Sequence, residues 1–160
     1  MAYSGYIKPL IIYVLLLVSV FINKIFNVSF LTPFILLLPL IFVDTKDLNL
    51  KSVWNFSLIF VVPIFFISDF TLVLSQFLTA FSEELFFRVY MMKYFSNLIT
   101  SILFTVPHIV LYNDLHSFLV FFPSLFYGFV YQRTKSLILV TVLHFLSNVF
   151  YAFFFVNWNK

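Results

Sequence analysis

Cysteine is absent from the sequence, glycine occurs only twice, and charged residues make up only 9% of its 160 residues. The absence of cysteine excludes disulfide bonds, thiolate nucleophiles and cysteine-ligated metal, so any catalytic group must be an oxygen or an imidazole. The small net charge of +3, with its cationic residues scattered along the chain, argues against nucleic acid as a partner. Charged residues are also far scarcer than the roughly 25% of ordinary soluble domains. Water is therefore not expected to be the main solvent of this chain.

Long apolar stretches take up most of the chain, of which 63% is hydrophobic. A membrane-spanning helix needs about 20 mostly apolar residues, so the chain has room for about six or seven spans and for no soluble domain. We expect an all-α integral membrane protein, a single membrane domain over residues 1–160, built as a bundle of about seven transmembrane helices in contact with membrane lipids. The expected helices cover residues 7–26, 28–43, 53–67, 72–92, 98–111, 118–132 and 137–156.

Polar residues and prolines divide and bend these helices. The run over residues 53–92 is too long for one crossing, and we divide it at Asp69 and the serine before it, which are its polar interruption ahead of the glutamates. Pro33, Pro39 and Pro63 are expected to kink the second and third helices.

The distribution of lysine and arginine indicates an orientation, because cytoplasmic loops are enriched in these residues. With the N-terminus inside, the inner loops hold Lys8, Lys46, Lys51, Lys93, Arg133 and Lys135, and the outer side holds Lys24 and Lys160. Arg88 falls within a span. This asymmetry predicts an N-inside and C-outside arrangement, in what we expect to be the cytoplasmic membrane of a prokaryote.

Three ionisable residues lie in the middle of the fourth expected helix: Glu83, Glu84 and Arg88. Each such residue costs about 2.5–3.5 kcal/mol at the bilayer centre, so something must compensate them. Glu84 and Arg88 are four residues apart on one helix face and can neutralise each other. Glu83 lies about 100° around the helix and is the carboxylate left for chemistry. The alternative is that all three merely hold helices together.

Two later helices contribute His108, His144 and Asn148. At about 1.5 Å per residue, Glu83, His108 and His144 lie ~14, ~16 and ~12 Å from the inner ends of their helices, and therefore reach one layer of the membrane. A carboxylate and two imidazoles in one cavity can supply a general base, a polarising partner and an oxyanion donor. This combination predicts hydrolysis.

These residues form an ordered set of short motifs: Glu83-Glu84-x-x-x-Arg88, Phe104-x-x-x-His108 and His144-x-x-x-Asn148, with Gly128 between the last two. The set resembles the CPBP family, the CaaX-protease and bacteriocin-processing (Abi-like) intramembrane endopeptidases. The resemblance covers roughly the last half of the chain. It divides the domain into variable N-terminal helices over residues 1–70 and a CPBP-like catalytic core over residues 71–158.

The resemblance also implies catalytic roles. The first glutamate and the middle histidine of the family, here Glu83 and His108, activate water. The last histidine and the asparagine, here His144 and Asn148, stabilise the oxyanion. Glu84 and Arg88 then take supporting places.

Metal is a separate question, because the family is often labelled metalloprotease. Glu83, His108 and His144 are acceptable ligands for Zn²⁺, with water as the fourth. The sequence has no His-Glu-x-x-His helix, however, and we favour a mechanism that requires no cofactor.

The favoured function is therefore an intramembrane endopeptidase that hydrolyses a peptide bond of a membrane-associated protein or peptide, with prenylated and hydrophobic substrates both open. The alternative is a non-catalytic scaffold or immunity protein of the same fold that binds a toxin or another membrane partner. A proton-coupled carrier that uses Glu83 and the histidines as a relay is a third reading, which the lack of paired repeats and of discontinuous Gly-rich helices disfavours.

Overall fold

The computed structural model describes residues 4–49, 52–64, 69–152 and 154, and all regular structure within these residues is helical. This confirms the expected all-α class. The α-helices are α1 (Ser4–Phe26), α2 (Leu31–Leu37), α4 (Phe70–Glu84), α5 (Asn97–Tyr112), α6 (Leu115–Leu119), α7 (Phe121–Thr134) and α8 (Leu137–Tyr151).

The second and third expected helices differ from the prediction. After α2 the chain tightens into a 3₁₀ helix, η1 (Leu38–Ile41), because Pro39 has no backbone N–H to continue the α-helical hydrogen bonds. The third expected helix, residues 53–67, begins as expected but does not have the pitch of an α-helix over residues 53–60. It forms a 3₁₀ helix, η2 (Val53–Phe60), and residues 65–67 lie outside the described residues.

The division at Asp69 is confirmed, because α4 begins at the next residue. The Asp69 side chain accepts a hydrogen bond from the backbone N–H of Leu72 at 3.0 Å, and so satisfies one of the donors that every helix start leaves open. The fourth expected helix then changes pitch twice. It continues as a π-helical turn, η3 (Leu85–Tyr90), and a short 3₁₀ turn, η4 (Met91–Lys93).

The C-terminal half follows the prediction more closely. Ser96 and Ser136 cap α5 and α8, each accepting a hydrogen bond from a backbone N–H three residues later. The sixth expected helix is two helices, α6 and α7, which meet at Val120. Pro123 explains the break, since it cannot donate a hydrogen bond to the turn before it.

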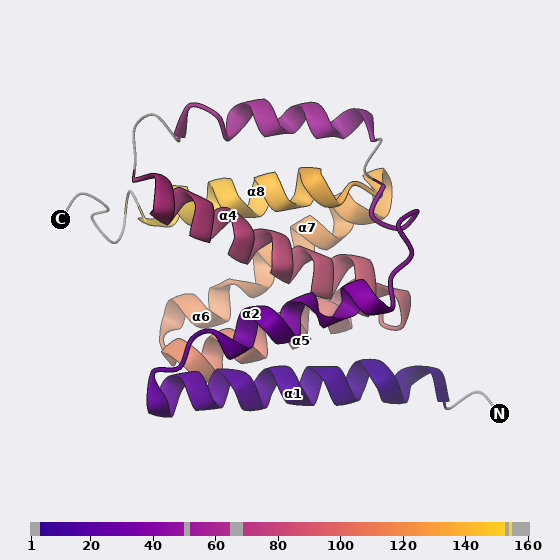
Figure 1. Cartoon of the computed structure of the whole chain (residues 1–160), viewed down its shortest axis with the longest axis vertical. Coiled ribbons are helices and arrows are strands. Elements are labelled where there is room, and N and C mark those ends of the chain that lie inside the picture. The colour runs from indigo at the N-terminus through magenta and orange to yellow at the C-terminus, as the bar shows by residue number, and fades with distance from the viewer. Residues whose placement is uncertain (1–3, 50–51, 65–68, 153, 155–160) are drawn as a thin grey trace.

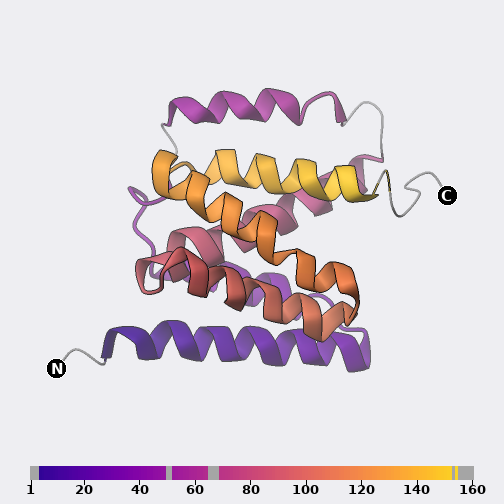
Figure 2. The same ribbon diagram turned by 180° about the vertical axis from the view of Figure 1, so that it is seen from behind.

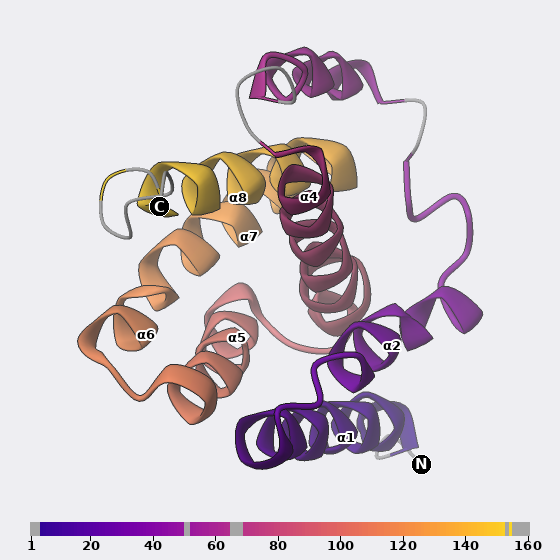
Figure 3. The same ribbon diagram turned by 60° about the vertical axis from the view of Figure 1, so that its left-hand side comes forward.

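The helices cross the same layer back and forth (Figures 1 and 2). The N-terminal end of α1 and the C-terminal ends of η1, η4 and α7 lie on one side, while the C-terminal ends of α1, α5 and α8 lie on the other. Figure 3 shows α4 in the centre, where it contacts α8 and α2, with α1 on the outside of the bundle. Most side chains in the first part of α4 are exposed, whereas its C-terminal end carries the buried Ala80, Ser82 and Glu84.

The exterior is more apolar than that of a soluble protein, while the apolar core also holds several ionisable side chains. Large apolar side chains are more often exposed than buried, whereas Glu84, Arg88 and His144 are buried. Such an apolar exterior fits contact with lipid. Within the described part of the chain, two helical stretches are long and apolar enough to span a membrane, residues 5–26 and 70–93, and the other apolar helices are shorter. The number of crossings and their orientation stay predictions.

One tertiary hydrogen bond shows how the fold compensates a proline. Pro107, inside α5, leaves the carbonyl of Leu103 without its helical donor, and the Tyr13 hydroxyl of α1 donates to that carbonyl at 2.8 Å. Tyr13→Phe should therefore destabilise the protein by about 1 kcal/mol, which corresponds to a fall of about 2–4 °C in thermal midpoint for a domain of this size. A melting curve of the purified protein in detergent measures the change.

Tyr6→Phe is the matched control, because Tyr6 lies on the same helix, is exposed, and keeps its ring contact with Phe95 after the change. Equal melting temperatures for the two variants would contradict a structural role for the Tyr13 hydroxyl.

Candidate active site

A buried ion pair lies at the junction of α4 and η3. Glu84 and Arg88 are both fully buried, and Arg88 Nε donates to Glu84 Oε2 at 2.9 Å. Arg88 Nη2 donates to the hydroxyl of Ser124, on α7, at 2.8 Å. The expected pairing across one helical turn is thus present, and it also ties α7 to the pair.

His144, on α8, lies between the two glutamates. Its Nδ1 is 2.9 Å from Glu84 Oε1, and its Nε2 is 3.5 Å from Glu83 Oε2. Because an ionised carboxylate only accepts hydrogen bonds, Nδ1 is the nitrogen that carries a proton toward Glu84. Glu84 therefore does more than neutralise Arg88, as the sequence suggested. It also orients the imidazole that contacts Glu83.

Aromatic rings fix the His144 imidazole from two sides. Tyr127, on α7, stacks on it with ring centroids 5.4 Å apart, and Phe104, on α5, meets it edge-on at 5.7 Å. The Tyr127 hydroxyl donates to Ser147 on α8 at 2.6 Å. Sequence reasoning missed Ser124 and Tyr127. The sequence feature that could have identified them is their spacing of three residues, which places two polar side chains on one face of an apolar helix.

His108, on α5, is held in one tautomer. Its Nδ1 lies 2.9 Å from the carbonyl oxygen of Phe104, and because a carbonyl only accepts, Nδ1 donates. In the neutral ring, Nε2 then keeps a free lone pair. The Phe104 ring also stacks on the His108 imidazole at 4.7 Å.

Glu83 and His108 line the same small cavity, whose volume is about 80 Å³. Its remaining wall is formed by α1, α2, η3 and α5, mainly through apolar side chains such as Leu16 and Phe87. One water needs about 10–15 Å³ of such space, so the cavity can hold water between the carboxylate and the imidazole. Only 17% of the Glu83 side chain is exposed. The carboxylate is therefore largely enclosed, and it lines the cavity.

Asn148 lies one helical turn beyond His144 on α8 and is half-buried. Among the hydrogen bonds of the described residues, none joins its side chain to Glu83, His108 or His144. The structure thus brings Glu83 to both His144 and the cavity of His108, and leaves the role of Asn148 as a prediction.

Zinc does not fit the three alternative ligands as they are placed. Among the described residues, no group of three histidine, aspartate or glutamate side chains is arranged to hold a metal ion. Glu83, His108 and His144 therefore do not form a three-ligand site here.

Comparison with curated proteins and with solved structures gives no match. A protein-family model described as type II CAAX prenyl endopeptidase Rce1-like matches residues 66–150. This segment is more than half of the chain and contains the glutamates, Arg88, both site histidines and Asn148. The family expected from the ordered motifs is thereby confirmed: the chain belongs to the type II CAAX prenyl endopeptidase Rce1-like family.

Proposed function

We propose that the chain is an intramembrane endopeptidase that hydrolyses a peptide bond of a prenylated or hydrophobic membrane-associated substrate. The observation that carries this proposal is the common cavity of Glu83 and His108, a carboxylate and an imidazole that line one space large enough for water from different helices. Family membership supports a protease of this kind. The same residues would have no need of a shared cavity in a non-catalytic scaffold.

Water activation begins the proposed reaction. A water in the cavity gives a proton to Glu83 while His108 Nε2 accepts its second hydrogen bond, and the water oxygen attacks the carbonyl carbon of the substrate. The carbonyl oxygen becomes an oxyanion, which His144 in its doubly protonated form and the amide of Asn148 stabilise by hydrogen bonds. The C–N bond then breaks, and the leaving amine takes the proton held by Glu83.

Glu84 and Arg88 act through His144. The hydrogen bond from Nδ1 to Glu84 stabilises the imidazolium and aims Nε2 toward Glu83, which lines the cavity. Arg88 in turn fixes Glu84, and Ser124 fixes Arg88. This chain of buried hydrogen bonds keeps the oxyanion donor in place before the substrate arrives.

A cleavage assay tests the proposal. The purified protein in lipid vesicles is given a fluorogenic peptide with a farnesylated cysteine near its C-terminus, and the same peptide without the farnesyl group. We expect one or both peptides to be cut, with the released fragment identified by mass, and we expect cutting to persist after exhaustive chelation. If neither peptide is cut by folded protein, the non-catalytic scaffold gains support. Loss of cutting on chelation, restored by Zn²⁺, would contradict the metal-free mechanism.

We also propose that the chain crosses the cytoplasmic membrane of a prokaryote seven times, with its N-terminus inside and its C-terminus outside. The back-and-forth course of the helices supports this arrangement (Figure 1). Lys46, Lys93 and Lys135, three of the six cations expected inside, line one cavity at a single end of the bundle. Lys24, expected outside, donates to the carbonyl of Val110 near the other end of α5.

Cysteine labelling tests this orientation, and the native absence of cysteine gives it a clean background. Ser29→Cys and Thr45→Cys place single thiols at exposed loop positions on opposite sides of the bundle. On intact cells, a membrane-impermeant maleimide should label Ser29→Cys at once, and Thr45→Cys only after permeabilisation. The reverse order, or equal labelling of both, would contradict the proposed orientation.

A further inference from the structure

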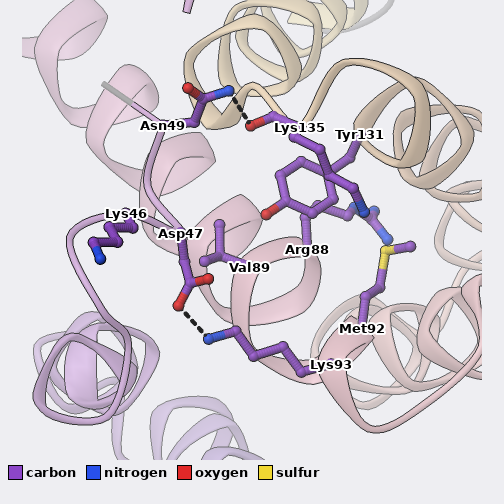
Figure 4. A pocket seen from close by; sticks show the side chains of 9 residues that line it. All are labelled: Lys46, Asp47, Asn49, Arg88, Val89, Met92, Lys93, Tyr131 and Lys135. Atoms are coloured by element: carbon purple, nitrogen blue, oxygen red, sulfur yellow. Dashed lines mark hydrogen bonds and ion pairs between the residues drawn. The ribbon is translucent and has the colours of Figure 1, made fainter. Parts of the chain in front are cut away.

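A second and larger cavity lies at the end of the bundle where η4 and α7 end. Its volume is about 390 Å³, within the range of about 300–1,000 Å³ common for small-molecule sites. Neither Glu83 nor His108 lines it. The lining side chains come from the loop over residues 44–49, from η3 and η4, and from the end of α7 (Figure 4).

The wall of this cavity is strongly cationic. Lys46, Lys93, Lys135 and Arg88 line it, against the single carboxylate of Asp47. Lys93 Nζ donates to Asp47 Oδ2 at 2.5 Å, and this hydrogen bond holds the pKa of the Asp47 carboxyl below its usual range. Asp47 is therefore ionised and already paired. The lining residues thus carry four positive charges and one negative charge, and an excess of positive charge remains when Glu84, the ion-pair partner of Arg88, is also counted.

Arg88 also has an unused donor. Its Nε and Nη2 are taken by Glu84 and Ser124, neither of which lines the cavity, while Nη1 is buried and has no hydrogen-bond partner. Arg88 lines the cavity, so Nη1 belongs to a guanidinium that lies beside it, although Nη1 itself has no exposed surface. A buried donor without an acceptor costs free energy, which a ligand oxygen would recover.

The cavity is held in shape by the loop that covers it. Asn49 Nδ2 donates to the backbone carbonyl of Lys135 at 3.1 Å, and the Lys93–Asp47 pair fastens the same loop to η4. Figure 4 shows the Tyr131 hydroxyl pointing into the space between Asp47 and Arg88. Ammonium groups, a guanidinium and a phenol together offer several hydrogen-bond donors to one anion.

We propose that this cavity binds a phosphate group, and that the anionic headgroup of a membrane phospholipid supplies it. Phosphate offers the several acceptor oxygens that such a set of lysines and an arginine binds best. The cavity lies at the helix ends, at the level where headgroups meet a membrane protein, and basic pockets between helices on the cytoplasmic side are known to take anionic lipids. The proposal does not depend on peptidase activity, since the cavity excludes the catalytic carboxylate.

A binding measurement with three probes tests the site. The purified full-length protein in nonionic detergent is titrated with short-chain phosphatidylglycerol, short-chain phosphatidylcholine or inorganic phosphate, and its melting temperature is followed. We expect phosphatidylglycerol to raise the melting temperature saturably and phosphatidylcholine to have little effect. The double variant Lys46→Gln/Lys135→Gln should bind phosphatidylglycerol about 25-fold more weakly, about fivefold for each lysine.

The matched control removes two cations on the same side of the bundle but outside the cavity, Lys8→Gln/Arg133→Gln. It should keep wild-type affinity. A different outcome is that inorganic phosphate binds with the same dependence on the cavity lysines and competes with the lipid. The cavity would then be a phosphate site whose ligand is a soluble phosphate, and the lipid source would be contradicted. Two results would overturn the proposal: equal weakening by the control pair, or no saturable effect of either phosphatidylglycerol or inorganic phosphate.

Discussion

Glu83→Gln is expected to lower the rate of peptide cleavage by about 10²–10⁴-fold, the usual contribution of a positioned general base. Glutamine has nearly the shape of glutamate and can keep the contact with His144, whose Nε2 lies 3.5 Å from the Glu83 carboxylate. It cannot accept a proton from water. The fold should survive, because the change removes a charge from a largely enclosed position, and the melting temperature should stay equal to or above that of the wild type.

Asp114→Asn is the matched control for this variant. It makes the same change of carboxylate to amide on an exposed residue that caps α6, and asparagine caps a helix as well as aspartate does. Cleavage by this control should be unchanged. Substantial cleavage by Glu83→Gln, with the control active and both proteins folded, would exclude Glu83 as the base.

His108→Gln provides an independent arm of the same test. Glutamine retains hydrogen-bonding groups but lacks the free Nε2 lone pair that His108 directs away from the Phe104 carbonyl. We expect a comparable loss of cleavage, and the double variant with Glu83→Gln should lose little more than either single one, since residues that act on one water are not additive.

Part of the site could be predicted from the sequence because its logic is local. Glu84 and Arg88 are one helical turn apart, so their pairing follows from helix geometry alone, and the structure has it at 2.9 Å. The start of α4 could be predicted in the same way, because Asp69 is a favourable cap between two apolar runs. The ordered motifs identified the family for a related reason. Each motif pairs residues that are a few positions apart in the sequence and therefore share one face of a helix.

Other features depend on contacts between distant segments. Glu84 also contacts His144, which lies 60 positions away in the sequence. Helix spacing predicts contacts only between residues a few positions apart, so it predicts the contact with Arg88 but not this one. The same holds for Ser124 on α7, whose hydroxyl accepts a hydrogen bond from Arg88. The π-helical turn η3 and the 3₁₀ helix η2 were also unpredicted, because apolar periodicity indicates that a segment is helical without fixing its pitch.

The buried pair of Glu84 and Arg88 gives the largest expected effect on stability. Arg88→Met would leave the Glu84 carboxylate buried with His144 as its remaining partner, and removing one member of such a pair typically costs about 3–5 kcal/mol. For a chain of this length that corresponds to a fall in melting temperature on the order of 10 °C. Melting of the purified variant in detergent measures the loss.

The double variant Glu84→Met/Arg88→Met separates stability from catalysis. Replacing both charges with apolar side chains of similar length leaves no unpaired ion, so much of the lost stability should return. Cleavage should not return with it, because His144 Nδ1 then lacks the carboxylate that orients the ring and stabilises its protonated form. A double variant as unstable as Arg88→Met would contradict the charge-pair account. A stable double variant with full activity would show that His144 needs no help from Glu84, and the positioning role assigned to Glu84 and Arg88 would have to be given up.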